Sequence, residues 1–264
     1  MNPFSIVSSS LKEMFQYREL FFNLVSRELQ SRYKGSYLGF LWSLLNPLLM
    51  MVVYSVIFSI VMRIKIENYS LYLFAGLLPW TWFSTALSNG AGSIIFNSSL
   101  VKKVYLPTEL LPVVAVTTNL INFLLTIPIL LLFIAFHHVP LTWALLAVPL
   151  VIAVQFLFTL GVAMFLAVLN VFFRDIEQLI GVIILVWMYG SPILYSPDMV
   201  PEKFRLFYDL NPMAAIIHSY HQIFIHGTLP SLHSFAFPLL LGLVLVASGL
   251  ILFSLTKFEF AEAI

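Results

Sequence analysis

Long apolar segments with almost no charge are the feature that most constrains this chain. Six of them, each about 18 residues or longer, alternate with short segments that hold nearly all ionisable side chains. Lipid offers no hydrogen-bond partners to the backbone, so a spanning segment must be a helix or part of a closed barrel. The alternating pattern of barrel strands is missing. We therefore predict an all-α integral membrane protein with six transmembrane helices near residues 36–62, 70–92, 110–136, 141–169, 178–195 and 232–256.

The composition fits this reading, because 9% of the residues are charged where a soluble domain has about 25%. Residues 1–35 lack the basic start and compact apolar core of a cleavable signal. They place apolar side chains at helical spacing, so we predict cytoplasmic N-terminal amphipathic helices there. Residues 36–257 then form the transmembrane domain, and residues 258–264 form a cytoplasmic C-terminal tail.

The basic residues predict the orientation. An even number of spans puts both termini on one side, which then holds nine of the 13 Lys and Arg residues. By the positive-inside rule, both termini are expected in the cytoplasm, with the chain in the cell inner (plasma) membrane. The net charge of +1 and the lack of a basic cluster predict no nucleic-acid partner. The nine residues are Lys12, Arg18, Arg27, Arg32, Lys34, Lys102, Lys103, Arg174 and Lys257.

Motifs that would carry chemistry are missing from the sequence. The chain has no P-loop motif, so we expect any ATP to be bound by another subunit. The centres of the six segments hold no Asp, Glu, Lys, Arg or His, which argues against ion-coupled transport. The pair His218 and His221 and the pair His137 and His138 lack nearby third ligands, and the chain has no cysteine. We therefore predict no metal site and no catalytic residues.

Polar and aromatic residues inside the apolar segments suggest a path for cargo. Asn119 and Asn122 recur at helical spacing with Thr118 and Thr126, and would form a polar stripe on one helix. Contacts between helices are the alternative explanation. A conduit for hydroxyl-rich cargo would also be lined by such amide and hydroxyl groups, together with the ring faces of aromatic side chains. The channel-lining candidates are Trp42, Tyr54, Asn119, Asn122, Trp187 and Tyr189.

Residues 197–227 differ from the other connecting segments. Three prolines punctuate a polar stretch, and residues 213–226 are apolar but too few to cross a bilayer. We predict an external re-entrant or interfacial helical segment that caps the exit of a pathway.

Several blocks resemble the membrane subunits of type-2 ABC transporters that export polysaccharides. The resemblance covers residues 27–260 in order and includes the pair Asn46 and Pro47. The other blocks are residues 27–29 (REL), 32–42 (RYKGSYLGFLW), 76–80 (GLLPW), 97–107 (NSSLVKKVYLP), 170–175 (NVFFRD), 191–195 (SPILY) and 211–212 (NP).

The resemblance implies a homodimer that pairs with two copies of a separate ATP-binding subunit, which would use ATP and Mg. It also implies that residues 94–108 form a coupling loop that docks on the ATPase. Substrate entry from the cytoplasmic leaflet would involve Tyr33, Lys34 and Tyr37. The coupling residues would be Ser98, Ser99, Leu100, Val101, Lys102, Lys103, Val104 and Tyr105.

The cargo is less well defined than the class of protein. A lipid-linked polysaccharide is expected, with O-antigen first, teichoic acid second and capsular polysaccharide third. A drug or lipid exporter permease would have the same architecture. A membrane-embedded glycan polymerase or acyltransferase would need acid–base residues in its external loops, and these loops offer few.

Overall fold

The computed structural model describes residues 3–35, 38–39, 41–61, 66–103 and 105–264. Within these ranges every regular element is a helix. The first half contains α1 (Pro3–Gln16), α2 (Arg18–Tyr33), α3 (Leu41–Ser55), the π-helix η1 (Val56–Val61), α4 (Tyr69–Phe96), α5 (Ser98–Lys103) and α6 (Leu110–Phe136). The second half contains the 3-10 helix η2 (Trp143–Ala147), α7 (Val148–Phe172), α8 (Ile176–Tyr189), the 3-10 helix η3 (Pro197–Met199), α9 (Glu202–Asp209), α10 (Pro212–Phe224), α11 (Leu232–Thr256) and α12 (Phe260–Ala263).

The prediction of an all-α membrane protein is confirmed in its coarse form. Among the described residues, three stretches are long and apolar enough to cross a bilayer: Leu110–Phe136, Trp143–Phe172 and Ser234–Thr256. Shorter apolar stretches lie at Leu44–Ile60 and Ile176–Tyr189. The predicted segment 178–195 is helical only to Tyr189, because a turn at residues 190–194 ends α8.

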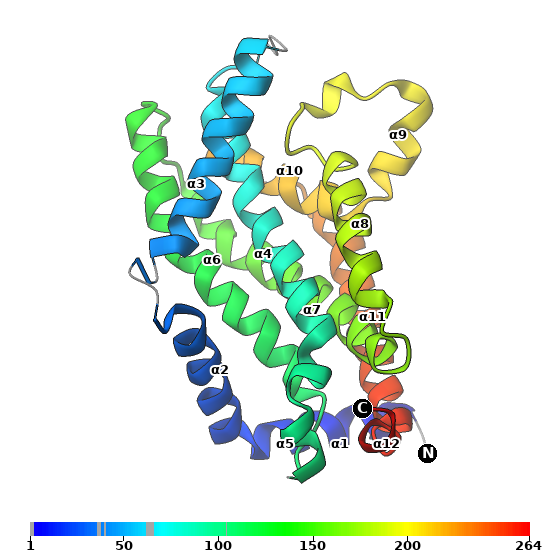
Figure 1. Ribbon diagram of the computed structural model, residues 1–264. Coiled ribbons are helices and arrows are strands. Elements are labelled where there is room, and N and C mark those ends of the chain that lie inside the picture. Colours follow the sequence, from blue (N-terminus) through cyan, green and yellow to red (C-terminus); the bar gives the residue numbers. More distant parts are fainter. Residues whose placement is uncertain (1–2, 36–37, 40, 62–65, 104) are drawn as a thin grey trace.

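Both termini lie at one end of the helical bundle, next to α1, α5 and α12 (Figure 1). The opposite end holds α9. At the centre, α4 packs against α3, α6, α7, α8 and α10, and most of its side chains are buried. Its central position explains why α4 carries more small and polar residues than a lipid-facing helix needs.

Glycines allow the closest helix contacts. A Cβ atom added to Gly161 on α7 would lie 2.5 Å from the Cβ of Leu245 on α11. A Cβ at Gly242 would lie 2.8 Å from the backbone nitrogen of Phe158. Small residues let backbones approach in this way where lipid provides no hydrophobic drive for association.

Buried amides add hydrogen bonds between α7 and α4. Gln155 Nε2 donates to the carbonyl oxygen of Pro79 at 2.8 Å, and Asn170 Nδ2 donates to that of Ala91 at 3.0 Å. Both amide side chains are fully buried. These bonds fix the register of the two helices at two levels along the bundle.

The segment predicted to be re-entrant does contain a helix that enters the bundle. Asn211 caps α10 by accepting from the backbone N–H groups of Met213 and Ala214, and Pro212 begins the helix. α10 then packs against α4, α7 and α11, and its His221 is buried. His221 Nε2 lies 3.0 Å from the carbonyl oxygen of Tyr72, so this imidazole holds α10 to α4.

Candidate functional site

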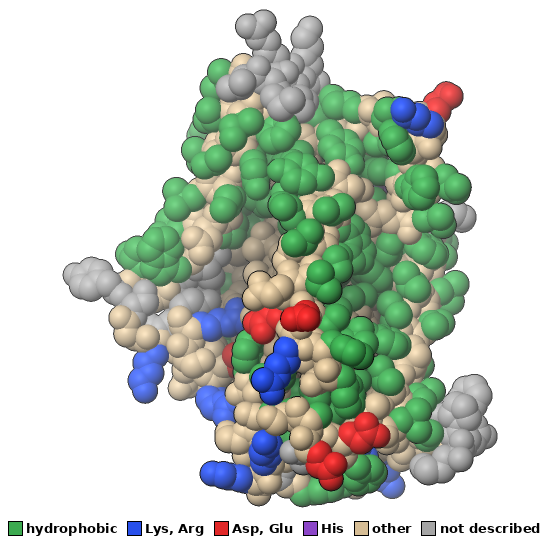
Figure 2. Space-filling model, turned by 45° about the vertical axis from the view of Figure 1, so that its right-hand side comes forward, with side chains coloured by type: hydrophobic (Ala, Val, Ile, Leu, Met, Phe, Trp, Pro, Cys, Tyr) green, Lys and Arg blue, Asp and Glu red, His purple; other side chains and the backbone are tan. Residues whose placement is uncertain are grey.

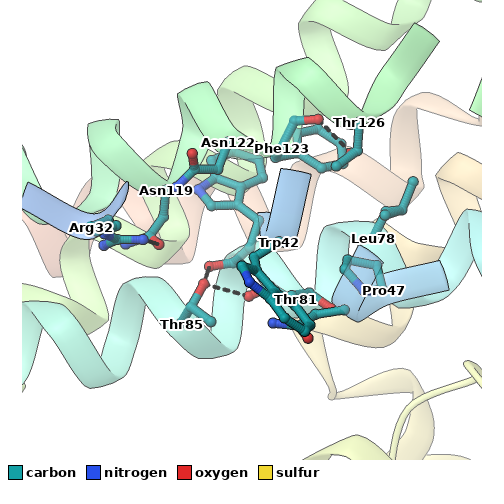
Figure 3. Close-up of a pocket in the computed structure, with 12 residues that line it drawn as sticks. Arg32, Trp42, Pro47, Leu78, Thr81, Thr85, Asn119, Asn122, Phe123 and Thr126 are labelled. Atoms are coloured by element: carbon teal, nitrogen blue, oxygen red, sulfur yellow. Dashed lines mark hydrogen bonds between the residues drawn. The ribbon is translucent and has the colours of Figure 1, made fainter. Parts of the chain in front are cut away.

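Two cavities with polar side chains in their linings lie side by side among α2, α3, α4 and α6. We call the first the central cavity; its volume is about 240 Å³ (Figure 3). The second, the α2 cavity, has a volume of about 230 Å³ and lies toward the end of the bundle that holds α5. The central cavity is lined by Arg32, Trp42, Asn46, Pro47, Leu78, Thr81, Trp82, Thr85, Asn119, Asn122, Phe123 and Thr126. The α2 cavity is lined by Leu24, Arg27, Glu28, Ser31, Arg32, Asn89, Ser93, Phe96, Asn97, Leu111, Val114 and Ala115.

Arg32 lines both cavities and therefore stands at their boundary. Its Nη1 donates to Asn119 Oδ1 at 2.9 Å, and its Nη2 pairs with Glu28 Oε1 at 3.1 Å. Asn119 lies nine residues into α6, about 14 Å along the helix axis. The last turn of α2 thus brings a partly exposed guanidinium against α6 and α4, whose own sequences carry no charge.

Asn119 connects three helices. Besides accepting from Arg32 on α2, its Oδ1 lies 3.4 Å from Nδ2 of Asn89 on α4, and its own Nδ2 donates to the carbonyl oxygen of Ala115 at 2.7 Å. The side chain is 2% exposed. Of the predicted polar stripe on this helix, Asn119, Asn122 and Thr126 all line the central cavity.

Thr118 belongs to a different face of α6. Its hydroxyl donates to the carbonyl oxygen of Val114 at 2.8 Å, and it lines neither cavity. Helical spacing groups residues within a wide arc, and the neighbouring helices decide which of them face a cavity.

Aromatic and hydroxyl side chains complete the central cavity. Trp82 stacks on Phe123 with 5.1 Å between ring centroids, and its indole N–H points to the carbonyl oxygen of Val116 at 3.4 Å. Trp42 on α3 is 43% exposed and forms part of the opposite wall. Thr81 and Thr85 add hydroxyl groups from α4, as Figure 3 shows. The cavity therefore presents amides, hydroxyls and ring faces, with one cation.

The six channel-lining candidates separate into two groups. Trp42, Asn119 and Asn122 come together in the central cavity. Tyr54, Trp187 and Tyr189 do not line it. 

The members of the second group lie on α3 and α8. Trp187 on α8 donates from Nε1 to Asn211 Oδ1 at 2.8 Å and packs edge-on against Phe83. Tyr54 on α3 meets Phe58 edge-on, and Tyr189 at the end of α8 is 54% exposed.

Among the substrate-entry candidates, Tyr33 is the last residue of α2. Lys34 follows α2 and is exposed. Tyr37 and the side chain of Tyr33 lie outside the part of the chain that the structure describes. The structure therefore describes only Lys34 among these side chains.

The coupling candidates form a short helix at the end of the bundle that holds both termini. α5 exposes Ser99, Lys102 and Lys103, whereas Leu100 and Val101 pack against the apolar core. Ser98 is the first residue of this helix. Val104 lies outside the described residues. Tyr105, the next residue, is 75% exposed. The helix thus has an anchored apolar face and a free basic face.

The N-terminal helices α1 and α2 both form side-chain hydrogen bonds with residues next to α5. Arg27 on α2 donates from Nη2 to Asn97 Oδ1 at 2.6 Å, and Asn97 is the residue between α4 and α5. The hydroxyl of Tyr105 lies 3.3 Å from Glu13 Oε1 on α1. α1 and α2 are therefore linked directly to the segment around α5.

Glu109, just before α6, is a buried carboxyl that sequence reasoning missed. It is 1% exposed and accepts a hydrogen bond from Ser10 on α1. Burial raises the pKa of Glu109, while Lys257 and Ser10 oppose that shift. No periodic signal marks this residue, because the helices that bury it come from both ends of the chain.

The histidines give no sign of a metal centre. His221 is engaged with Tyr72, and Nε2 of His137 lies 3.2 Å from the Ser70 hydroxyl. Among the described residues no three His, Asp or Glu side chains gather as a metal site would require.

Charge and apolar surface separate along the molecule. On the face in Figure 2, Lys and Arg side chains gather over the half that holds the termini, and hydrophobic side chains cover most of the remainder. α9, at the opposite end, carries Lys203 and Arg205.

Comparison with known proteins assigns the family. The family model described as ABC-2 type transporter matches residues 19–225. The chain belongs to the ABC-2 type transporter family. This confirms the expected resemblance and the expectation of a transporter permease rather than an enzyme, and it points to a multi-pass inner-membrane protein. The matched residues of this ABC-2 permease include both cavities and α5.

Relatives of this ABC-2 permease have names that concern polysaccharides. The O-antigen export system permease protein RfbA of Myxococcus xanthus is 39% identical over 96% of this chain and 98% of its own length. A protein of the same name from Klebsiella pneumoniae is 38% identical over 96% of this chain and 99% of its own length. The polysialic acid transport protein KpsM of Escherichia coli is 21% identical over 87% of this chain and 90% of its own length.

Proposed function

We propose that this ABC-2 permease is the membrane subunit of an ATP-driven exporter that moves a lipid-linked polysaccharide, O-antigen first, out of the cytoplasm. The observation that carries the proposal is the 39% identity to an O-antigen export permease over nearly the full length of both chains. The relative that transports polysialic acid is far more distant, at 21% identity. This difference favours O-antigen over capsular polysaccharide.

The proposed assembly is a homodimer with two copies of an ATP-binding subunit, which use ATP and Mg. Each permease chain crosses the membrane six times, with both termini in the cytoplasm. The apolar face of α8 is exposed in the single chain, where Val182 and Val186 are 62% and 66% exposed. This exposure supports the proposal that a second copy of the chain or lipid covers that face. The gathering of Lys and Arg side chains near the termini supports the orientation.

α5 is proposed as the coupling helix. Its basic face, Lys102 and Lys103, is free to meet an ATP-binding subunit. A push on α5 would reach α4 through the chain and α2 through the bond between Arg27 and Asn97. Arg32 lies on the same helix as Arg27, so the movement would also reach the boundary between the two cavities.

The cavities are proposed as part of the cargo path. Sugars would meet amide and hydroxyl groups and the ring of Trp42, all of which can contact a neutral glycan without holding it tightly. Substrate would enter beside Tyr33, Lys34 and Tyr37. The candidates on α3 and α8, Tyr54, Trp187 and Tyr189, would line the conduit where two copies face each other.

An export assay tests the function. The chain is expressed with its ATP-binding subunit in a strain that makes lipid-linked O-antigen but lacks its own exporter, and surface polysaccharide is measured. We expect surface polymer only when both subunits are present and the P-loop of the partner is intact. Export by the permease alone, driven by a sodium or proton gradient, would overturn the proposal.

A further inference from the structure

The α2 cavity has the composition of an anion site. We propose that it binds the diphosphate group of the lipid-linked cargo, with Arg32 and Arg27 as the cationic ligands. The inference deepens the proposed function and rests on it. It places the diphosphate in the α2 cavity and the sugars in the central cavity next to it. The substrate-entry candidates Tyr33, Lys34 and Tyr37 do not by themselves assign the two parts of the cargo to separate cavities.

The two arginines supply charge and geometry. Both line the α2 cavity, and each guanidinium carries five N–H donors. Arg32 uses one contact for Asn119 and one for Glu28, and Arg27 has a contact with Asn97. Donors remain on both groups, and the planar fork of arginine matches phosphate oxygens better than a lysine ammonium does.

A buried hydroxyl points to a ligand independently of the charges. Ser93 on α4 lines the α2 cavity, is 5% exposed, and its Oγ has no hydrogen-bond partner within the described chain. A buried hydroxyl without a partner destabilises the fold, because it has lost its hydrogen bonds to water. An oxygen of a bound phosphate would satisfy it.

Glu28 sets the charge balance of the cavity. Its carboxylate also lines the α2 cavity and pairs with Arg32, so the lining carries two cations and one anion. A bound diphosphate would compete with Glu28 for the guanidinium of Arg32. Removing the charge of Glu28 should therefore strengthen binding, although it breaks an ion pair.

Because Arg32 lies between the two cavities, diphosphate binding in the α2 cavity can affect the cargo path through the central cavity. The contact with Asn119 lies where the α2 cavity and the central cavity meet, since Arg32 lines both. An anion in the α2 cavity would attract Arg32 away from Asn119 and join the two spaces. Binding of the diphosphate in the α2 cavity would then be coupled to entry of the first sugars into the central cavity.

The test measures binding of a radiolabelled polyprenyl diphosphate to the purified complex of permease and ATP-binding subunit. Arg32→Gln should weaken binding at least tenfold and Ser93→Ala by about threefold. Glu28→Gln should strengthen it severalfold, which misfolding cannot produce. Arg18→Gln, an exposed arginine on the same helix that lines neither cavity, should leave binding unchanged.

Competition separates the sources of the ligand. Inorganic diphosphate should compete weakly, because it lacks the lipid that holds the headgroup at the membrane. If it binds as tightly as the lipid, with the same response to the variants, the assignment to lipid-linked cargo is wrong. If Arg32→Gln and Glu28→Gln change binding in the same direction, the α2 cavity is not the site.

The export assay distinguishes the two proposals. A complex that exports polysaccharide but binds the lipid diphosphate without regard to Arg32, Glu28 and Ser93 would refute this site and leave the proposed function standing. A complex that neither binds the lipid nor exports polymer would refute the function itself.

Discussion

Arg27 donates a 2.6 Å hydrogen bond to the side-chain oxygen of Asn97, at the corner where α4 becomes α5. The backbone oxygen of Asn97 accepts from Leu100 and Val101, and its Nδ2 donates to the carbonyl oxygen of Ser93. One residue therefore starts α5, ends α4 and holds α2. Movement of α5 relative to α4 and α2 would act on this corner.

Removing the acceptor at this corner should uncouple the transporter. Asn97→Leu leaves Arg27 without its partner, so we expect basal ATP hydrolysis by the assembled complex to persist while polysaccharide export falls about tenfold, equivalent to about 1.4 kcal/mol. Asn97→Asp keeps an oxygen for Arg27 and should retain most export. Equal loss in both variants would contradict this role for the bond.

Helix packing at the glycines makes a prediction about stability. Gly161→Ala places a methyl group 2.5 Å from Leu245 Cβ, and we expect a loss of about 1–3 kcal/mol from overpacking. Gly181→Ala on α8 is the matched control, because no atom lies within 4 Å of the added Cβ. Thermal unfolding in detergent should show a lower melting temperature for Gly161→Ala alone, and an equal loss in Gly181→Ala would contradict the packing argument.

The basic face of α5 should govern assembly. Replacing Lys102 and Lys103 together by Glu reverses the charge offered to the ATP-binding subunit, and recovery of that subunit in affinity purification should fall about tenfold. The control reverses Lys203 and Arg205 on α9, at the other end of the molecule, and should recover the subunit normally. Unchanged recovery with reversed α5 lysines would move the docking surface elsewhere.

Glu109 should make stability depend on pH. Burial raises its pKa above the ordinary 4.5, so the folded state holds a proton that the unfolded state releases. The contribution of this group is fully present below pH 4.5 and is lost as the pH rises through the raised pKa. Glu109→Gln removes the titration, so at neutral pH the variant should be more stable than the natural chain and melt at a higher temperature.

Melting temperatures between pH 4.5 and pH 7.5 check this expectation. The variant and the natural chain should agree at the acidic limit and diverge as the pH rises. Glu202→Gln on exposed α9 should follow the natural chain throughout. A difference between Glu109→Gln and the natural chain that stays constant with pH would show that the carboxyl does not titrate in this range.

Much of the candidate site could be predicted from residue types along the chain. Trp42, Asn119 and Asn122 stand out as polar or aromatic groups inside apolar segments, and the structure gathers them in the central cavity. The short helix at α5 also follows from its sequence. Tyr54 and Trp187 have the same signature but lie elsewhere, because a residue type does not reveal which neighbour a helix face meets.

The charged residues of the site could not be predicted in this way. Counting Lys and Arg treats each as a topology signal, so Arg32 reads as one more cytoplasmic charge. In the structure it reaches from the surface to the buried amide of Asn119, 87 positions away in the chain. Glu109 reads as a loop carboxyl, but it is buried near Ser10 and Lys257, which lie close to the two ends of the chain.

The amino-acid sequence by itself determined that this protein is a bundle of helices in a membrane. Lipid cannot hydrogen-bond the backbone, so each long apolar segment must satisfy its own peptide groups, and that requirement is local to the segment. Tertiary structure decided which polar groups share a cavity and which charged side chains line it. Those outcomes depend on side chains from separate helices meeting at hydrogen-bond distance, and only packing brings Arg32 to Asn119 and Arg27 to Asn97.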